Sequence, residues 1–161
     1  MSENIVKAEE KKLNEIKQYI VVKIGEEQYG IDIQYVDNIV RMQRITRVPK
    51  AQSYFYGVIN IRGEIIPVMS LRNKFELETD KFADKTRILI IKLEPQAAIG
   101  IIVDEVKNVV ELSEDEIERF VSTENDEKST YLSGVGKKDN GLISLLNLHN
   151  VIIEKENVTN N

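Results

Sequence analysis

Short runs of β-branched and aliphatic residues recur along most of the chain, and they predict a protein built mainly from β-strands. The runs at 18–25 and 87–94 are nearly continuous apolar stretches of strand length, whereas residues 57–63 alternate apolar with polar side chains. Such patterns are typical of β-strands. Further strands are expected at 28–33, 64–71, 97–104, 105–112, 131–138 and 141–148.

Helix signals are few. A short helix or turn is predicted after Asp32, a residue type that caps helices, because three apolar side chains there share one face: Ile33, Val36 and Val40. Ser113 and Glu116 have the spacing of a capping box, which indicates a second helix start. A last short helix is predicted over residues 146–153.

The chain also repeats itself weakly. A shift of 70 residues places 29–40 over 99–110, and a shift of 77 places 57–73 over 134–150. Glycine, asparagine and aliphatic residues match in the same order in both blocks. A duplicated unit is the simplest origin of such a pattern. We attribute the difference between the two shifts to the acidic stretch 122–130.

The repeat predicts one domain over residues 18–153 that contains two lobes of about five strands each, with a few short helices. Lobe 1 is expected at about 18–80 together with the C-terminal helix, and lobe 2 at about 81–147. Small closed barrels of this size leave no free sheet edge. Residues 1–17 are predicted to be a disordered or loosely helical tail, and residues 154–161 a frayed tail.

The composition excludes several kinds of chemistry. The 161 residues include no cysteine and one histidine, His149, so disulfides, thiolate sites and histidine-based triads or metal clusters have almost no basis. We therefore expect no catalytic site, no metal site and no cofactor. The absence of cysteine, of a signal peptide and of a long apolar run favours a cytoplasmic protein.

Charge is unevenly distributed along the chain, whose net charge is −5. Basic residues recur every third position at Arg41, Arg44, Arg47 and Lys50, whereas acidic residues crowd 111–127. Solvated surface is one explanation, and contact with different partners is the other. A β-barrel that binds nucleic acid is the alternative function, because Tyr54, Phe55 and Tyr56 follow the basic series. The negative net charge of the chain disfavours nucleic-acid binding.

The segment 56–68 carries the most specific motif. Apolar and polar residues alternate up to Arg62, and Gly63 then permits a tight turn into the next strand. The string Gly-Val-x-Asn-x-Arg-Gly followed by Pro67-Val68 resembles the signature of the CheW-like family. Other family blocks are resembled, in the expected order, at 26–33, 45–49, 100–104 and 131–136. Ser70 stands where many family members carry aspartate.

This resemblance spans about residues 18–153 and implies two interlocked SH3-like five-stranded barrels. It also implies a non-enzymatic adaptor that joins methyl-accepting chemoreceptors to the regulatory domain of the histidine kinase CheA. Such an adaptor is cytoplasmic, is recruited to membrane receptor arrays only through the receptors, and binds no nucleic acid.

Two barrels side by side leave an apolar groove at their seam, and we predict that the helical hairpin tip of a receptor binds there. The residues predicted to line this groove are Val36, Asn38, Ile39, Val40, Arg62, Ile102, Val106 and Val109. The residues predicted to contact the kinase are Arg41, Gln43, Arg44 and Arg47 on one lobe and Phe120 on the other. An ordinary core position for Phe120 stays open as the alternative.

Overall fold

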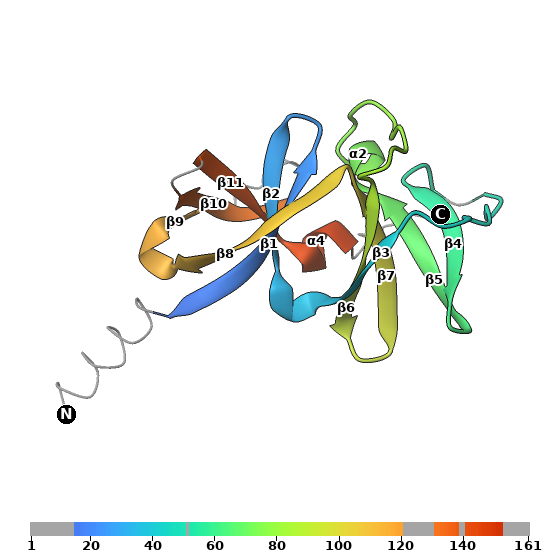
Figure 1. The fold of residues 1–161 in the computed structure, drawn as a ribbon, viewed down its shortest axis with the longest axis horizontal. Coiled ribbons are helices and arrows are strands. Elements are labelled where there is room, and N and C mark those ends of the chain that lie inside the picture. Colours follow the sequence, from blue (N-terminus) through green and yellow to red (C-terminus); the bar gives the residue numbers. More distant parts are fainter. Residues whose placement is uncertain (1–14, 51, 121–130, 139–140, 153–161) are drawn as a thin grey trace, which may run out of the picture.

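The computed structural model describes residues 15–50, 52–120, 131–138 and 141–152, which form two β-sheets linked by short helical segments (Figure 1). The six-stranded sheet has the order β8-β1-β2-β11-β10-β9, and the five-stranded sheet has the order β3-β6-β7-β5-β4. The elements are, in chain order, β1 (Ile16–Ile24), β2 (Glu27–Asp32), η1 (Ile33–Tyr35), β3 (Val36–Arg41), β4 (Phe55–Ile61), β5 (Glu64–Ser70), α2 (Leu71–Lys74), β6 (Arg87–Glu94), β7 (Ala97–Val103), β8 (Glu105–Ser113), η2 (Glu114–Glu116), β9 (Ile117–Arg119), β10 (Leu132–Lys138), β11 (Gly141–Leu146) and α4 (Leu148–Ile152).

Each sheet is assembled from both halves of the chain. Strand β3 leaves the β1–β2 hairpin and pairs with β6 in the five-stranded sheet, while β8 leaves the β6–β7 hairpin and pairs with β1 in the six-stranded sheet. The parallel pairs β2–β11 and β5–β7 also join the two halves. The predicted lobes 18–80 and 81–147 are therefore wrong as spatial units, because neither range contains a complete sheet.

The sequence repeat is visible in the register of the two sheets. Gly30 lies opposite Leu145 in the pair β2–β11, and Gly100 lies opposite Val68 in the pair β5–β7, so the shifts of 70 and 77 relate one pair to the other. A Cβ atom at Gly30 would lie 2.8 Å from Leu145 Cδ2, and one at Gly100 would lie 2.8 Å from Ile88 Cγ2. Both positions therefore need glycine for close packing against the neighbouring strand.

Neither sheet closes into the expected barrel. In the five-stranded sheet, Thr46 after β3 meets Val58 of β4 through a single isolated bridge. In the six-stranded sheet, the counterpart of this bridge is the short strand β9, in which Glu118 pairs with Val135 of β10. Val58 and Val135 are related by the shift of 77. Both sheets therefore make this contact, and in the six-stranded sheet it is long enough to count as a sixth strand, β9.

Three hydrophobic cores hold the sheets together, and the largest lies between them. Strands β1 and β6 send alternate side chains to different cores: Val22 and Leu89 enter the central core, whereas Val21 and Ile88 enter the core of their own sheet. The central core also receives Leu148 from α4, which lies between the sheets in Figure 1. This double burial explains the continuous apolar runs, since both faces of these strands are covered.

The helical segments are shorter than the sequence suggests. Asp32 does cap a helical turn, accepting a hydrogen bond from Gln34 N, but that turn covers only Ile33–Tyr35, and residues 36–41 are strand β3. The predicted helix with Val36 and Val40 on one face is therefore wrong. The capping box at Ser113 and Glu116 is confirmed, although it opens a single turn that leads into β9.

The chain ends only partly fall within the described residues. Helix α4 confirms the predicted last helix, and its Leu148 and Val151 are buried. Strand β1 begins at Ile16, inside the predicted tail 1–17. Residues 1–14 and the predicted frayed tail 154–161 lie outside the described residues.

A polar clamp joins the sheets at one end of the central core. Asp104, which links β7 to β8, accepts hydrogen bonds on Oδ2 from Gly25 N (2.8 Å) and Arg72 Nη2 (2.6 Å), and on Oδ1 from Arg72 Nε (3.1 Å). Burial would by itself raise the pKa of the Asp104 carboxyl. The hydrogen bonds from Arg72 and Gly25 outweigh burial, so the pKa lies below its ordinary value.

Replacing Asp104 with asparagine should lower the free energy of unfolding at neutral pH by about 1–2 kcal/mol, because Arg72 loses its charged partner. The folded chain holds the pKa of Asp104 below its unfolded value of about 3.9, so the contribution is complete above that pH and is lost as the pH falls through the lower folded pKa. Urea denaturation at about pH 7, 4 and 2.5 should therefore show the difference between wild type and Asp104→Asn shrinking with acidity.

The matched control is Glu105→Gln, because Glu105 contacts the exposed Lys85 at 3.6 Å and should contribute much less. A difference between wild type and Asp104→Asn that stays constant across the three pH values would contradict an ionic clamp.

Candidate functional site

The two strands that cross between the sheets, β3 and β8, are the first candidate site. Each is an outer strand of the sheet it joins, and each contains a bulge at an equivalent position, at Asp37 and at Lys107. A bulge re-aims the side chains that follow it, which here directs them away from the central core. The shift of 70 relates Asp37 to Lys107, so both sheets present these strands in the same way.

Equivalent side chains on these crossing strands are exposed. Ile39 is 39% exposed and Val109 is 49% exposed, although both are aliphatic residues within strands. Val36 and Val106 are half-buried and pack against the edge of the central core. Asn38 is exposed, and its Oδ1 accepts a hydrogen bond from Ile39 N at 2.9 Å. We use the name crossing-strand surface for six residues on these two strands, among them the exposed Asn108: Val36, Asn38, Ile39, Val106, Asn108 and Val109.

The structure corrects part of the predicted groove. Ile102 is 1% exposed and belongs to the core of the five-stranded sheet, opposite Ile88, so it lines no groove. Val40 is half-buried against that same core. The seam itself is filled by the central core, because the inner faces of both sheets contribute to it. Only the rim of the seam is open to a partner.

Arg62 lies at the tip of the β4–β5 hairpin. Ile61 pairs with Glu64, so Arg62 and Gly63 form a two-residue turn with positive φ angles of 52° and 85°. Asn60 Oδ1 accepts a hydrogen bond from Gly63 N at 2.9 Å and supports the turn. The turn type demands glycine or a tolerant residue at both positions, and it leaves Arg62 exposed to solvent.

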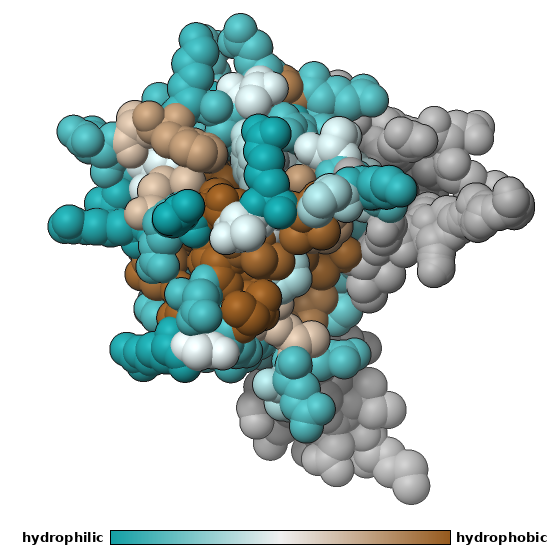
Figure 2. Space-filling model, turned by 90° about the vertical axis from the view of Figure 1, so that its right-hand side faces the viewer, coloured by the Kyte–Doolittle hydropathy of each residue, from teal (hydrophilic) through white to brown (hydrophobic). Residues whose placement is uncertain are grey.

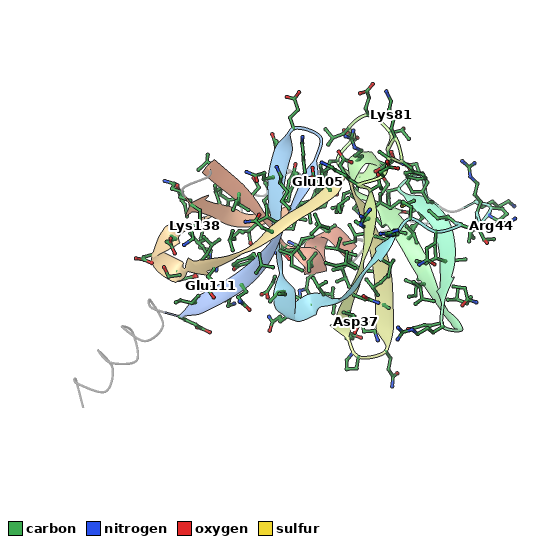
Figure 3. The ribbon with its side chains drawn as sticks, viewed as in Figure 1. Asp37, Arg44, Lys81, Glu105, Glu111 and Lys138 are labelled. Atoms are coloured by element: carbon green, nitrogen blue, oxygen red, sulfur yellow. The ribbon has the colours of Figure 1, made fainter. Side chains whose placement is uncertain are left out.

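The residues predicted to contact the kinase lie at opposite ends of the molecule. Arg41, Gln43, Arg44 and Arg47 are all exposed on and after β3, and Gln43 and Arg47 border a shallow cavity of about 230 Å³. Phe120 follows β9 in the six-stranded sheet and is 41% exposed, so it is not an ordinary core residue. Figure 3 shows Arg44 at one end of the molecule and Glu111 and Lys138 at the other.

Hydrophobic side chains accompany the basic residues at the end formed by the five-stranded sheet. Figure 2 shows a hydrophobic patch near the centre of this face, surrounded by hydrophilic residues. Exposed apolar side chains in this part of the fold include Val48 after β3, Ile65 in β5 and Phe82 before β6. A mixed surface of this kind is typical of protein–protein contacts.

The three aromatic residues behind the nucleic-acid alternative, Tyr54, Phe55 and Tyr56, are held by contacts within the protein. Tyr54 and Phe55 pack against the central core, and the Lys74 ammonium lies 4.0 Å from the centre of the Tyr54 ring. The Tyr56 hydroxyl donates a hydrogen bond to Asp80 Oδ2 at 2.8 Å. Rings held in this way are unavailable for base stacking. The basic series alone does not distinguish nucleic acid from an acidic protein surface.

No metal centre or membrane span is seen in the part of the chain that the structure describes. No group of three or more potential metal-ligating side chains converges there, and His149 instead packs edge-on against Tyr35 with ring centres 5.8 Å apart. No helix among the described residues is both long and apolar enough to cross a bilayer.

Two features of the structure were not predicted from the sequence. Ser70 stands where aspartate was expected, and its hydroxyl donates to Asp80 Oδ2 at 2.5 Å, so the loop supplies the missing carboxylate. Burial and the hydrogen bond to Asp80 raise the pKa of the Tyr56 hydroxyl beside it. The other feature is a cavity between the β1–β2 hairpin and α2. Neither carries a sequence signal, since both depend on how loops fold back.

Comparison with known proteins agrees with the fold. A sequence model of the CheW-like domain matches residues 18–156, which is most of the chain. The chain belongs to the CheW-like family. Among the curated relatives, the chemotaxis protein CheW of Bacillus subtilis is 32% identical over 137 residues, covering 85% of this chain and 86% of that protein. The CheW of Helicobacter pylori is 32% identical over 139 residues, with coverage of 86% and 82%.

A solved CheW structure has the same fold. The scaffolding protein TtCheW from Thermoanaerobacter tengcongensis superposes with a TM-score of 0.78 at 31% sequence identity, covering 88% of this chain and 95% of that one. These relatives are named as chemotaxis and scaffolding proteins, not as enzymes. The sequence-based assignment to the CheW-like family is confirmed.

The reassignment of Ile102 from groove to core is testable by stability. Ile102→Ala should lower the free energy of unfolding by about 2–4 kcal/mol, because it leaves a cavity in a closely packed core. Ile39→Ala, on the crossing-strand surface, should cost less than about 1 kcal/mol. Urea denaturation of both variants compares them directly. Equal and small losses of unfolding free energy in both variants would contradict the core position of Ile102.

Proposed function

We propose that this chain is a non-enzymatic adaptor of chemotaxis signalling that couples methyl-accepting chemoreceptors to the histidine kinase CheA. The match of the CheW-like domain over residues 18–156 carries this proposal. Its physical support is a rigid two-sheet body with separate exposed surfaces, which suits a protein that holds two partners at once. In this role the chain works in the cytoplasm and reaches the membrane only through receptor arrays.

The crossing-strand surface is the proposed receptor site. Its exposed Ile39 and Val109 lie at equivalent positions of the repeat, and Val36 and Val106 on the same strands pack against the edge of the central core. The apolar face of a receptor helix can bury these side chains in the manner of helix-in-groove recognition. Arg62 is exposed on its hairpin, where it is able to pair with a receptor carboxylate.

The two ends of the molecule are the proposed kinase sites. One end presents Arg41, Gln43, Arg44 and Arg47, and the other presents Phe120. Because these surfaces differ, each contact is heterologous, and repeated contacts build rings or extended arrays instead of a closed pair. The regulatory domain of the kinase is the proposed partner at both ends.

Substitutions at the proposed receptor site should weaken receptor binding without unfolding the chain. We expect Ile39→Asp and Val109→Asp each to weaken binding of a receptor hairpin peptide at least tenfold, because a carboxylate then faces the apolar helix, and Arg62→Ala to weaken it by about three- to tenfold. Fluorescence anisotropy with a labelled peptide measures this.

Leu142→Asp is the matched control, since Leu142 is a 63% exposed aliphatic residue on β11, outside the crossing strands. Unchanged affinity in Ile39→Asp and Val109→Asp would exclude the crossing-strand surface as the receptor site, and unchanged affinity in Arg62→Ala would exclude a contribution from Arg62.

The kinase surfaces are tested separately. Arg41→Ala and Phe120→Ala should each reduce co-purification with CheA, since each removes one of two contacts, whereas Glu94→Ala, at an exposed position at the end of β6 and outside both surfaces, should not. The double variant should lose binding altogether. Binding that survives in the double variant would exclude both patches.

A further inference from the structure

A pocket lies between the tip of the β1–β2 hairpin and the α2 region, and no partner proposed above occupies it. Its volume is about 490 Å³, within the range of about 300–1,000 Å³ typical of ligand pockets. Ile24 and Tyr29 line it from the six-stranded sheet, and Phe75 and Leu77 line it from the segment after α2. Figure 1 shows the hairpin and α2 on the same side of the molecule.

The floor of this pocket is aromatic. The rings of Tyr29 and Phe75 have centres 5.8 Å apart, and those of Phe75 and Tyr131 have centres 5.5 Å apart, so three tilted rings form a continuous surface. Leu77 is exposed beside them and Leu132 adds a further apolar wall. An apolar side chain of a ligand would be well covered here.

The rim of this pocket is negatively charged. Glu26, Glu27 and Glu78 all line it, and none of the three forms a salt bridge with another described residue. Arg72 also lines the pocket and is already bound to Asp104, and the Lys74 ammonium lies 5.8 Å from the centre of the Tyr131 ring. Glu27 accepts a hydrogen bond from the Tyr29 hydroxyl, which fixes one carboxylate at the edge of the aromatic floor. The pocket therefore favours a ligand whose apolar group lies on the aromatic floor and whose cationic group lies at the acidic rim.

We propose that this pocket binds a segment of a partner protein that carries an apolar or aromatic side chain directly beside an arginine or lysine. The apolar side chain lies on the rings of Tyr29, Phe75 and Tyr131, and the cation meets the glutamates of the rim. An anionic ligand such as nucleic acid is disfavoured by the same charges. Because the pocket takes residues from the six-stranded sheet and from α2 and the segment after it, its occupant contacts both sides of the Arg72–Asp104 clamp.

This pocket is separate from the receptor and kinase surfaces, so its test does not depend on the proposed function. The probe is the blocked dipeptide acetyl-Phe-Arg-amide, titrated into the ¹⁵N-labelled full chain and followed by NMR chemical shifts. Acetyl-Phe-Glu-amide and acetyl-Gly-Arg-amide are the matched probes that remove the cation and the aromatic ring. We expect saturable shifts around Tyr29, Phe75 and Leu77 with the first probe only.

Substitutions in the chain complete the test. Glu26→Gln combined with Glu78→Gln should weaken binding of acetyl-Phe-Arg-amide by roughly three- to tenfold, since two favourable charge contacts are lost at exposed positions. Leu77→Ser should weaken it as well. Glu111→Gln, at the distant end labelled in Figure 3, should leave it unchanged.

Three results would overturn the proposal. The first is equal binding of the Phe-Glu probe, the second is undiminished affinity in the double glutamine variant, and the third is a set of shifts that lies outside the pocket. Unchanged ¹⁵N–¹H chemical shifts outside the pocket in the same variants would show that their fold is intact.

Discussion

The central hydrophobic core shared by the two sheets is the interaction on which the rest of the molecule depends. Alternate side chains of β1 and β6 point into it from opposite sides, and α4 seals it between them. Because each sheet borrows strands from the other half of the chain, neither sheet exists without the other. The two sheets therefore behave as one body, and the surfaces on them keep fixed relative positions.

This packing explains why the surfaces that we propose for binding lie on the rim and at the ends of the molecule. The seam is occupied by packed aliphatic side chains, so partners have access only to the crossing strands, the hairpin tips and the loops. The bulges at Asp37 and Lys107 turn Ile39 and Val109 outward from strands that would otherwise be buried on one face. Exposed aliphatic side chains lower the stability of the folded chain in water. Their presence at equivalent places in both copies of a duplicated fold is what a binding surface would explain.

Much of the fold follows from the sequence, because apolar runs and turn residues record which positions are buried. The runs around Val22 and Leu89 predicted strands, the Arg62–Gly63 turn marked a hairpin, and the shifts of 70 and 77 predicted the duplication, all of which the structure bears out. The division into lobes was wrong, because a repeat in sequence does not reveal whether its strands pair within one copy or across copies. Ile102 was misassigned for a related reason, since periodicity alone does not say which face of β7 is covered.

The exchange of strands has a consequence for the order of events during synthesis. Tyr29 of β2 pairs with Ser144 of β11, 115 positions later in the chain. At about 5–20 residues per second, the ribosome exposes the first hairpin for several seconds or longer before its parallel neighbour emerges. Contacts of such long range slow folding, since the loop must close before they form. During this time the outer edge of β2 lacks its hydrogen-bonding partner, and the rate of translation sets how long it does so.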